Sequence, residues 1–180
     1  AFSNEIVWAG TLDENGVPVY GNGARSRHRG VELDGSWQPA TGFSLDAALT
    51  WSRNTFTDYR EHLDEMASIV YDGNRIAGYP DLMASLTGRT ELGGMRLALT
   101  GRFVGRFYLD NTEDNRRTPA ERAVPGHVER VNPSFVTVDL AATVPVPRVW
   151  TRAFGLGASE LVLRVNNLLD RRFTTFGYVE

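Results

Sequence analysis

Apolar and polar side chains alternate along most of this chain with a period of two residues. Five segments follow the pattern closely, and they are residues 30–37, 43–51, 81–92, 95–108 and 135–144. A period of two places successive side chains on opposite faces of a β-strand, so each segment is predicted to be a strand with one apolar face. Residues 161–165 and roughly 2–11 complete a set of about seven strands. The only competing helix is a short one over residues 60–71, REHLDEMASIVY, within a loop.

The predicted connections alternate between short and long. Residues 39–42 and 93–94 are rich in Gly and Pro and predict tight hairpin turns. Residues 58–79 and 109–133 are long and polar. This order places the long loops together at one side, expected to be extracellular, as outer-membrane barrels do. Residues 146–158 break the scheme, because a short turn is expected there and the segment is long.

Two environments explain strands of this kind. The apolar faces form a dry core in a soluble sandwich, whereas in a membrane barrel they meet lipid. Strand length favours the barrel, because residues 24–38 and 43–57 exceed even the ~9–11 residues that cross a bilayer. Aromatic residues also gather near the predicted strand ends, at Trp37, Phe43, Trp51 and Phe56. We therefore expect an all-β fold, an antiparallel up-and-down transmembrane β-barrel that is incomplete at about seven strands.

Three arginines extend the apolar face of one strand toward the predicted long loops. Arg25, Arg27 and Arg29 share their parity with Val31 and lie just beyond the apolar stretch. Guanidinium groups at this level suit a rim that faces anionic headgroups better than a dry core. We expect the three side chains to contact outer-membrane lipid at the extracellular rim.

Composition narrows the possible functions. The 180 residues are 42% apolar, carry a net charge of −3 and include no cysteine. The negative charge argues against binding to nucleic acid, and the absence of cysteine excludes a disulfide scaffold and thiolate metal sites. No run of about 18 apolar residues is present, so no membrane-spanning helix is predicted.

Two longer motifs resemble a known family. Residues 23–37, GARSRHRGVELDGSW, resemble a strand of TonB-dependent outer-membrane receptors that reads Arg-x-Arg-Gly-Val-Glu-Leu, with matches at Arg27, Arg29, Gly30, Val31, Glu32 and Leu33. Residues 165–178, VNNLLDRRFTTFGY, resemble the family's penultimate strand, Val-x-Asn-Leu-Phe-Asp-Lys-x-Tyr. The matches are Val165, Asn167, Leu168, Asp170, Arg171 and Phe173, with Leu169 in place of the usual Phe. GRFVGRFYLDN and SFVTVDLAA look like the strands that separate these two.

The resemblance implies a receptor in the outer membrane of a Gram-negative cell. Such a receptor takes up a scarce nutrient, expected here to be a ferric siderophore or a similar iron complex, with energy supplied by TonB through a plug domain. Nothing in the sequence corresponds to the plug or to the family's final strand. Residues 1–180 are thus expected to be the C-terminal portion of a barrel that closes with about 22 strands.

Two other interpretations remain open at this stage. A complete small barrel of about eight strands would serve as an anchor or adhesin. A soluble all-β binding protein would bury the apolar faces in a dry core. The sequence upstream of Ala1 distinguishes the receptor from the small barrel, because only the receptor continues into a plug domain.

No catalytic, cofactor or metal site is predicted, and we expect no enzyme. His28, His62 and His127 lack ligand spacing. Residues 110–115 could gather around calcium, but they lack the glycine and distal Glu of an EF-hand, so a solvated acidic loop is more typical. The candidates for plug or substrate contact face the expected lumen, and they are Glu32, Asp34, Asp46, Arg89, Arg102, Arg106, Asp139, Arg164 and Asn166.

One pair of amides conflicts with the alternation. Leu161, Leu163 and Val165 share the apolar face, so Asn166 faces the lumen and Asn167 would face lipid. A β-bulge at the pair would turn both amides inward and return Leu168 to the apolar face. The alternative is that the strand is already near the outer interface, where an outward amide costs little.

Overall fold

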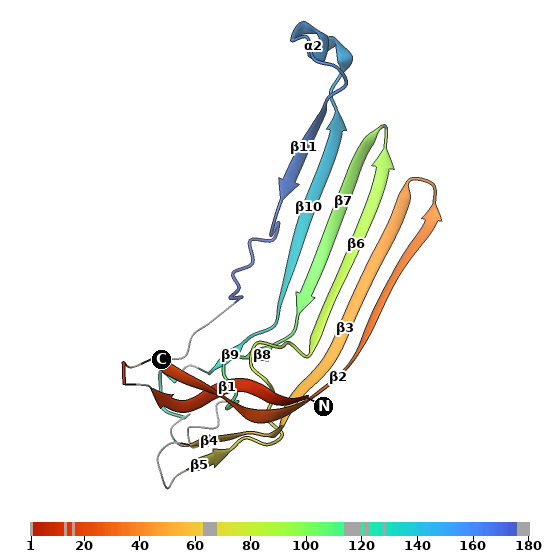
Figure 1. Ribbon diagram of the computed structural model, residues 1–180. Helices are drawn as coiled ribbons and strands as arrows, with labels where there is room; N and C mark the ends of the chain where they lie inside the picture. Colours follow the sequence, from red (N-terminus) through yellow and green to blue (C-terminus); the bar gives the residue numbers. More distant parts are fainter. Residues whose placement is uncertain are drawn as a thin grey trace.

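A computed structural model describes residues 2–12, 14–15, 17–62, 68–113, 120, 123–127 and 129–175. Within these ranges, no side chain is described in residues 2–12, 18–24 and 61–62. Figure 1 shows one long slanted sheet with two tight turns and a connection that contains a short helix at one end, and the other long connections at the opposite end.

The main sheet has seven strands in the order β1-β2-β3-β6-β7-β10-β11. The strands are β1 (Phe2–Leu12), β2 (Pro18–Ala40), β3 (Phe43–Asp58), β6 (Leu82–Leu92), β7 (Met95–Val104), β10 (Phe135–Pro145) and β11 (Glu160–Val165). All neighbouring strands are antiparallel, which confirms the predicted up-and-down order. β1 and β11 are the two edges of an open sheet, so the described residues form an incomplete barrel and not a complete small one.

Two small ladders and one helix lie outside the main sheet. β4 (Arg60–His62) pairs with β5 (Ser68–Val70), and β8 (Phe107–Tyr108) pairs with β9 (Val131–Asn132). The predicted helix over 60–71 is therefore wrong, although residues 63–67 lie outside the described part. Strand pairing prevails because alternate residues of this segment pack inward, with Ile69 against the cluster that contains buried Tyr71 while Val70 is exposed. The helix α2 (Arg148–Ala153) joins β10 to β11.

The two predicted hairpin turns are confirmed. β2 and β3 are joined by Thr41 and Gly42, and β6 and β7 by Gly93 and Gly94. The φ angles of Gly93 and Gly94 are +58° and +82°, a left-handed conformation that glycine adopts without strain in tight hairpins. In Figure 1 these turns lie at the opposite end from β4, β5, β8 and β9, so the two connections predicted to be long and polar share one end, while the β10–β11 connection with α2 lies at the end of the turns.

β7 is shorter than predicted. It ends at Val104. The backbone N–H of Gly105 still donates to the carbonyl oxygen of Leu82 at 2.8 Å, one step beyond the Met83–Val104 pair. A Cβ atom at Gly105 would lie 2.9 Å from that oxygen, so only glycine fits without a shift. Phe107, predicted to continue the apolar face, is instead buried.

The strand register sorts the side chains into two faces. One row across six strands joins Trp37, Leu45, Gly88, Leu99, Leu140 and Val165 as successive partners. The adjacent row joins Ser36, Asp46, Thr87, Thr100 and Asp139. Each predicted apolar set therefore falls on one face of the sheet.

The apolar face is uncovered. Leu99, near the middle of β7, is 50% exposed, and Trp37 on β2 is 63% exposed. In the part of the chain that the structure describes, no second layer packs over these side chains. A soluble sandwich would bury such a face, so the soluble interpretation does not fit.

Among the described residues, buried hydrophobic side chains occur only at the long-loop end. Phe56, Tyr59 and Tyr71 form a buried cluster, with Ile69 and Ile76 packed against it. The ring centroids of Phe56 and Tyr59 are 4.6 Å apart, and those of Tyr59 and Tyr71 are 5.5 Å apart. Among the described residues, no helix has the length and apolar character to cross a bilayer.

The asparagine pair ends β11, and the pairing beyond it carries the extra residue of the predicted bulge. The Leu168 N–H donates to the Val138 carbonyl at 2.6 Å, one residue out of the Leu140–Val165 register. β11 stops at Val165, and Asn167 adopts a φ of +53°. The side chain of Asn167 closes a turn, because its Nδ2 donates to the carbonyl of Arg171 and its Oδ1 accepts from the Arg171 N–H, both at 3.0 Å. Its backbone N–H donates to Asp139 at 2.8 Å. The amide is thus used for a local turn, which asparagine tolerates at positive φ.

Candidate functional site

A row of hydrogen-bonding side chains crosses the polar face of the sheet. We call Ser36, Asp46, Thr87, Thr100 and Asp139 the polar ladder, because they are successive strand partners. The Ser36 hydroxyl donates to Asp46, and the hydroxyls of Thr87 and Thr100 are 3.0 Å apart. The backbone N–H of Asn167 reaches Asp139 at its far end.

Arginines neutralise both carboxylates of the polar ladder. Arg89 on β6 forms an ion pair with Asp46 on β3, and Arg102 on β7 forms one with Asp139 on β10. Four of the nine predicted lumen candidates are thus brought together in two cross-strand pairs. Opposite charges on neighbouring strands typically stabilise a sheet by ~0.2–1 kcal/mol, so these pairs account for their own members without a ligand.

A third pair was not among the predicted site residues. Arg96 on β7 reaches across β10 to Glu160 on β11, with its Nη2 2.8 Å from Oε2. The sequence does indicate that Arg96 lies on the polar face, because its position in the strand has the same parity as that of Arg102. The sequence does not indicate that Glu160 meets Arg96, because only the register of β11 on β10 places the two side chains together.

The remaining candidates have no ion partner within the described residues. Glu32 and Asp34 are exposed on β2, and Arg164 is exposed on β11, so the two acids and the base lie toward opposite edges of the sheet. Asn166 is exposed just after β11. Arg106 follows the end of β7, so strand parity does not fix its direction.

A polar chain continues the same face toward the long loops. Ser26 and His28 on β2 hydrogen-bond through Oγ and Nε2 at 2.8 Å, and His28 Nδ1 lies 2.8 Å from Oδ1 of Asn54 on β3. The rings of His28 and Tyr79 also contact each other edge to face, with their centroids 6.4 Å apart. The described residues hold no group of three His, Cys, Asp or Glu side chains placed for a metal ion.

The two long connections are hydrogen-bonded to each other at the long-loop end, beyond Ser26, His28 and Asn54. Asn111 is the centre of the contact, because its Oδ1 accepts from the Ala77 N–H at 2.9 Å and its carbonyl accepts from Asn74 Nδ2 at 3.1 Å. The carboxylate of Glu113 accepts from the backbone N–H of Arg75. We call residues 54–59, 71–81, 107–113 and 130–132 the loop base.

Asp110 anchors the second long connection. Its carboxylate binds Arg130 at 2.7 Å and accepts from both the N–H and the hydroxyl of Thr112. Burial alone raises the pKa of Asp110, but the hydrogen bonds from Thr112 and Arg130 outweigh it and hold the pKa below its usual value. The acidic run therefore makes loop contacts at Asp110, Asn111 and Glu113, while Asp114 and Asn115 lie outside the described residues.

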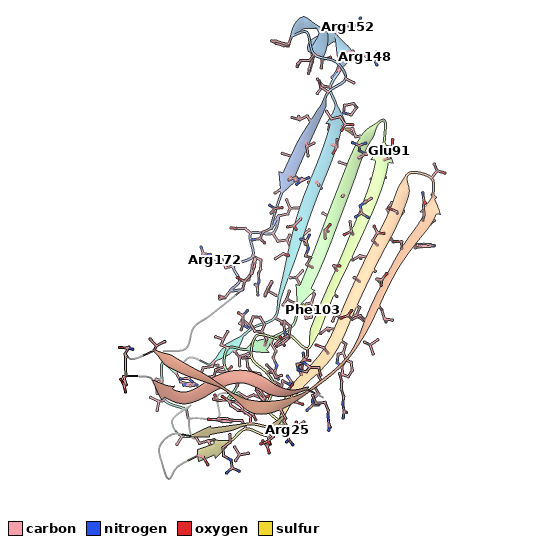
Figure 2. All side chains as sticks on the ribbon, in the orientation of Figure 1. Arg25, Glu91, Phe103, Arg148, Arg152 and Arg172 are labelled. Carbon is pink, nitrogen blue, oxygen red and sulfur yellow. The ribbon has the colours of Figure 1, made fainter. Side chains whose placement is uncertain are left out.

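Two of the three predicted rim arginines, Arg27 and Arg29, lie on the apolar side of β2 by register, whereas Arg25 pairs with Asp58 beyond a register shift. Arg27 and Arg29 pair with Thr55 and Arg53 of β3, two and one steps along the same face from the Val31–Trp51 pair. Arg53, which the sequence argument missed, is directly opposite Arg29, and like charges opposite each other destabilise a sheet. Arg25, Arg27, Arg29 and Arg53 are exposed, and no described carboxylate forms an ion pair with them. Figure 2 shows Arg25 at the long-loop end.

Comparisons with known proteins agree with this geometry. The family described as "TonB dependent receptor-like, beta-barrel" matches residues 1–168. The pesticin receptor of Yersinia enterocolitica is 26% identical over 171 residues, which cover 91% of this chain and 20% of that protein. The pesticin receptor of Yersinia pestis is 27% identical over 165 residues, covering 88% and 19%. The chain thus spans about a fifth of the length of these curated relatives.

Solved structures share the fold. The ferric yersiniabactin uptake receptor FyuA from Yersinia pestis superposes with a TM-score of 0.63 at 22% identity, over 90% of this chain and 21% of that one. The ferric-catecholate import receptor Fiu from E. coli K12 gives 0.60 at 12% identity, over 97% and 20%. The solved structures show the fold, and the family match over residues 1–168 shows that the chain belongs to the TonB-dependent receptors, as part of their β-barrel.

Proposed function

We propose that this chain is the C-terminal portion of a receptor barrel that imports a ferric siderophore across the outer membrane of a Gram-negative cell. The observation that carries the proposal is the two-faced sheet: its apolar face is uncovered, and its opposite face carries paired charges. This arrangement fits a wall between lipid and a polar lumen. Membership of the receptor family supports transport in preference to catalysis.

The substrate class rests on the relatives. FyuA is described as a ferric yersiniabactin uptake receptor and Fiu as a ferric-catecholate import receptor, so iron complexes of small organic chelators recur among the structural neighbours. The polar chain of Ser26, His28 and Asn54 and the loop base lie at the end of the lumenal face where such a complex would enter.

TonB and the plug are the proposed protein partners. In the receptor family TonB acts on the plug domain, which occupies the barrel lumen. The lumenal residues without an ion partner among the described residues, Glu32, Asp34 and Arg164, are the ones we assign to contacts with the plug. The pairs Asp46–Arg89 and Arg102–Asp139 are already neutral and would serve the wall itself.

Uptake by the intact receptor tests this proposal. A strain that lacks the receptor gene is compared with the same strain carrying the gene on a plasmid, using radioactive iron bound to a catecholate siderophore or to yersiniabactin. We expect uptake of iron from one class of siderophore to require both the receptor and TonB. Uptake of ferrous iron serves as the matched control. Equal uptake of every complex by both strains would overturn the transport proposal.

We further propose that the four rim arginines bind phosphate groups of the outer-leaflet glycolipid. Anions between Arg29 and Arg53 would relieve the repulsion that their register creates. The test compares the Arg29→Gln/Arg53→Gln variant with Arg89→Gln, which removes a lumenal arginine of the same sheet. We expect only the rim variant to retain less lipopolysaccharide after purification, and equal retention by both variants would contradict the assignment.

A further inference from the structure

The connection between β10 and β11 differs from the two hairpin turns at the same end. Residues 146–159, here called the α2 loop, contain the helix Arg148–Ala153 where the other hairpins have two-residue turns. The loop is closed at its base, because the N–H of Val146 donates to the carbonyl of Ser159 at 2.9 Å. In Figure 1 α2 extends beyond the strand ends.

The backbone of the α2 loop is well hydrogen-bonded. The helix begins after Pro147, whose missing N–H is not needed at a helix start. It ends in a Schellman motif: Gly155, at φ +66°, donates to the carbonyl of Arg152 at 3.0 Å, and Leu156 donates to that of Thr151 at 2.9 Å. A fixed backbone determines which side chains the loop presents.

Those side chains are apolar and exposed. Val149, Trp150, Phe154 and Leu156 fall within eight consecutive positions, and Phe154 is 81% exposed, more than Leu99 on the lipid-facing side of the sheet at 50%. A single exposed apolar residue is ordinary, but four large exposed ones within one short loop favour an interaction surface.

The charges of the loop are all positive. Arg148 and Arg152 are its only charged residues, because positions 146–159 contain no Asp, Glu or Lys. At about 100° per residue along a helix, Arg148 and Arg152 share one side, while Trp150 and Phe154 share the opposite side. Figure 2 shows both arginines at the outermost end of the molecule.

We propose that the α2 loop is an interfacial anchor that binds the phospholipid headgroups of the periplasmic leaflet. The loop follows the Val144–Leu161 pair, the last pair on the lipid-facing side of β10 and β11, so its apolar residues continue that surface. An apolar side with Trp and Phe, opposed by arginines, matches helices that lie in a membrane interface. The arginines suit lipid phosphates, which accept from a guanidinium group at two points.

The depth of residue 154 in a bilayer tests the proposal. The intact receptor is reconstituted in vesicles of phosphatidylethanolamine and phosphatidylglycerol, with a fluorophore on Phe154→Cys. This chain has no cysteine of its own. Any cysteine elsewhere in the receptor is first replaced by serine. Matched controls carry the label at Leu99→Cys, in the middle of the wall, and at Thr41→Cys, in the exposed β2–β3 turn.

Three quenchers separate the possible occupants. We expect the label at 154 to be quenched several-fold more by a shallow nitroxide lipid than by iodide, at a depth of ~5–10 Å, while the label at 99 responds most to a deep nitroxide lipid. Quenching by iodide equal to that at Thr41 would place the loop in water and overturn the proposal. Shielding from all three quenchers would mean that the plug or another protein covers it, and would also overturn it.

A second variant tests the phosphate contact. With phosphatidylglycerol replaced by phosphatidylcholine, we expect shallow quenching of the label at 154 to fall in the otherwise native receptor. The Arg148→Gln/Arg152→Gln variant is expected to lose this dependence on anionic lipid. Persistence of the dependence in the variant would refute the role of the arginines. None of these measurements uses a substrate, so their failure and a failure of siderophore uptake are distinguishable.

Discussion

Leu99 and Phe56 lie on strands of the same sheet, yet the first is 50% exposed and the second 1% exposed. Leu99 belongs to the wall, which we define as β2, β3, β6, β7, β10 and β11 below the loop base. Phe56 belongs to the loop base and packs against Tyr59 and Tyr71. The wall presents its apolar side chains outward, whereas the loop base buries them among one another.

The difference reflects two solvents. Inside a bilayer the lipid chains take the place of a protein core, and the strands need only satisfy their backbone groups by pairing. Above the bilayer the chain meets water, so apolar side chains must be covered by protein. The polar groups follow the same division, since Asp46 and Asp139 of the wall pair with arginines across strands while Asp110 is half-buried under Arg130 and Thr112.

The largest effect is expected in the loop base. Phe56→Ala removes the most buried ring of the cluster and should cost ~3–5 kcal/mol of local stability, because the cavity cannot fill from lipid. Hydrogen exchange of residues 71–78 should accelerate while β7 stays protected. Trp51→Ala, on the exposed face of the same strand, is the control. Equal acceleration in both variants would show that the two regions are not distinct.

Leu99→Arg tests the solvent of the wall. An arginine on the lipid face near the bilayer midplane should cost ~2–4 kcal/mol, because its charge has neither water nor a partner there. Thr100→Arg places the same group on the polar face beside Arg102 and should cost much less. Denaturant titrations of refolding into vesicles measure both. Similar costs for the two variants would contradict the assignment of faces.

Asp110→Asn tests the loop base through pH. Hydrogen bonds to a charged group are typically worth ~1.5–3 kcal/mol, so we expect faster proteolysis near residues 109–113 at neutral pH. The pKa of Asp110 is lowered in the fold, so its contribution is present above its ordinary pKa of ~3.9 and is lost as pH falls through the lower folded value. Only the native receptor should show this acid step. An identical step in the variant would assign it elsewhere.

The smallest effect is expected at the Asp46–Arg89 pair of the wall. Arg89 is 55% exposed and Asp46 35% exposed, so water screens the pair. A double-mutant cycle with Asp46→Ala and Arg89→Ala should give a coupling of ~0.2–1 kcal/mol. A coupling of several kcal/mol would mean that the lumenal face is far drier than its exposure indicates.

The sequence predicts the strands of the wall correctly but not the secondary structure of residues 60–71 at the long-loop end. A strand with lipid on one face and water on the other alternates apolar and polar residues along its length. The faces of β3, β6, β7 and β10 can therefore be predicted from the sequence. The loop base carries no such constraint, and residues 60–71 were misread as a helix because period-two burial over three-residue strands is too short to recognise.

The alternation, the glycine turns and the motifs were enough to determine a barrel wall and the family. Only the tertiary structure decided that Arg53 stands opposite Arg29, that Glu160 meets Arg96 across a strand, and that the Asn167 side chain closes a turn with Arg171. The physical reason is the separation in sequence between the interacting residues. Periodicity is a property of each strand alone, whereas register, reach across a strand and the end of β11 depend on partners that lie far away in the chain.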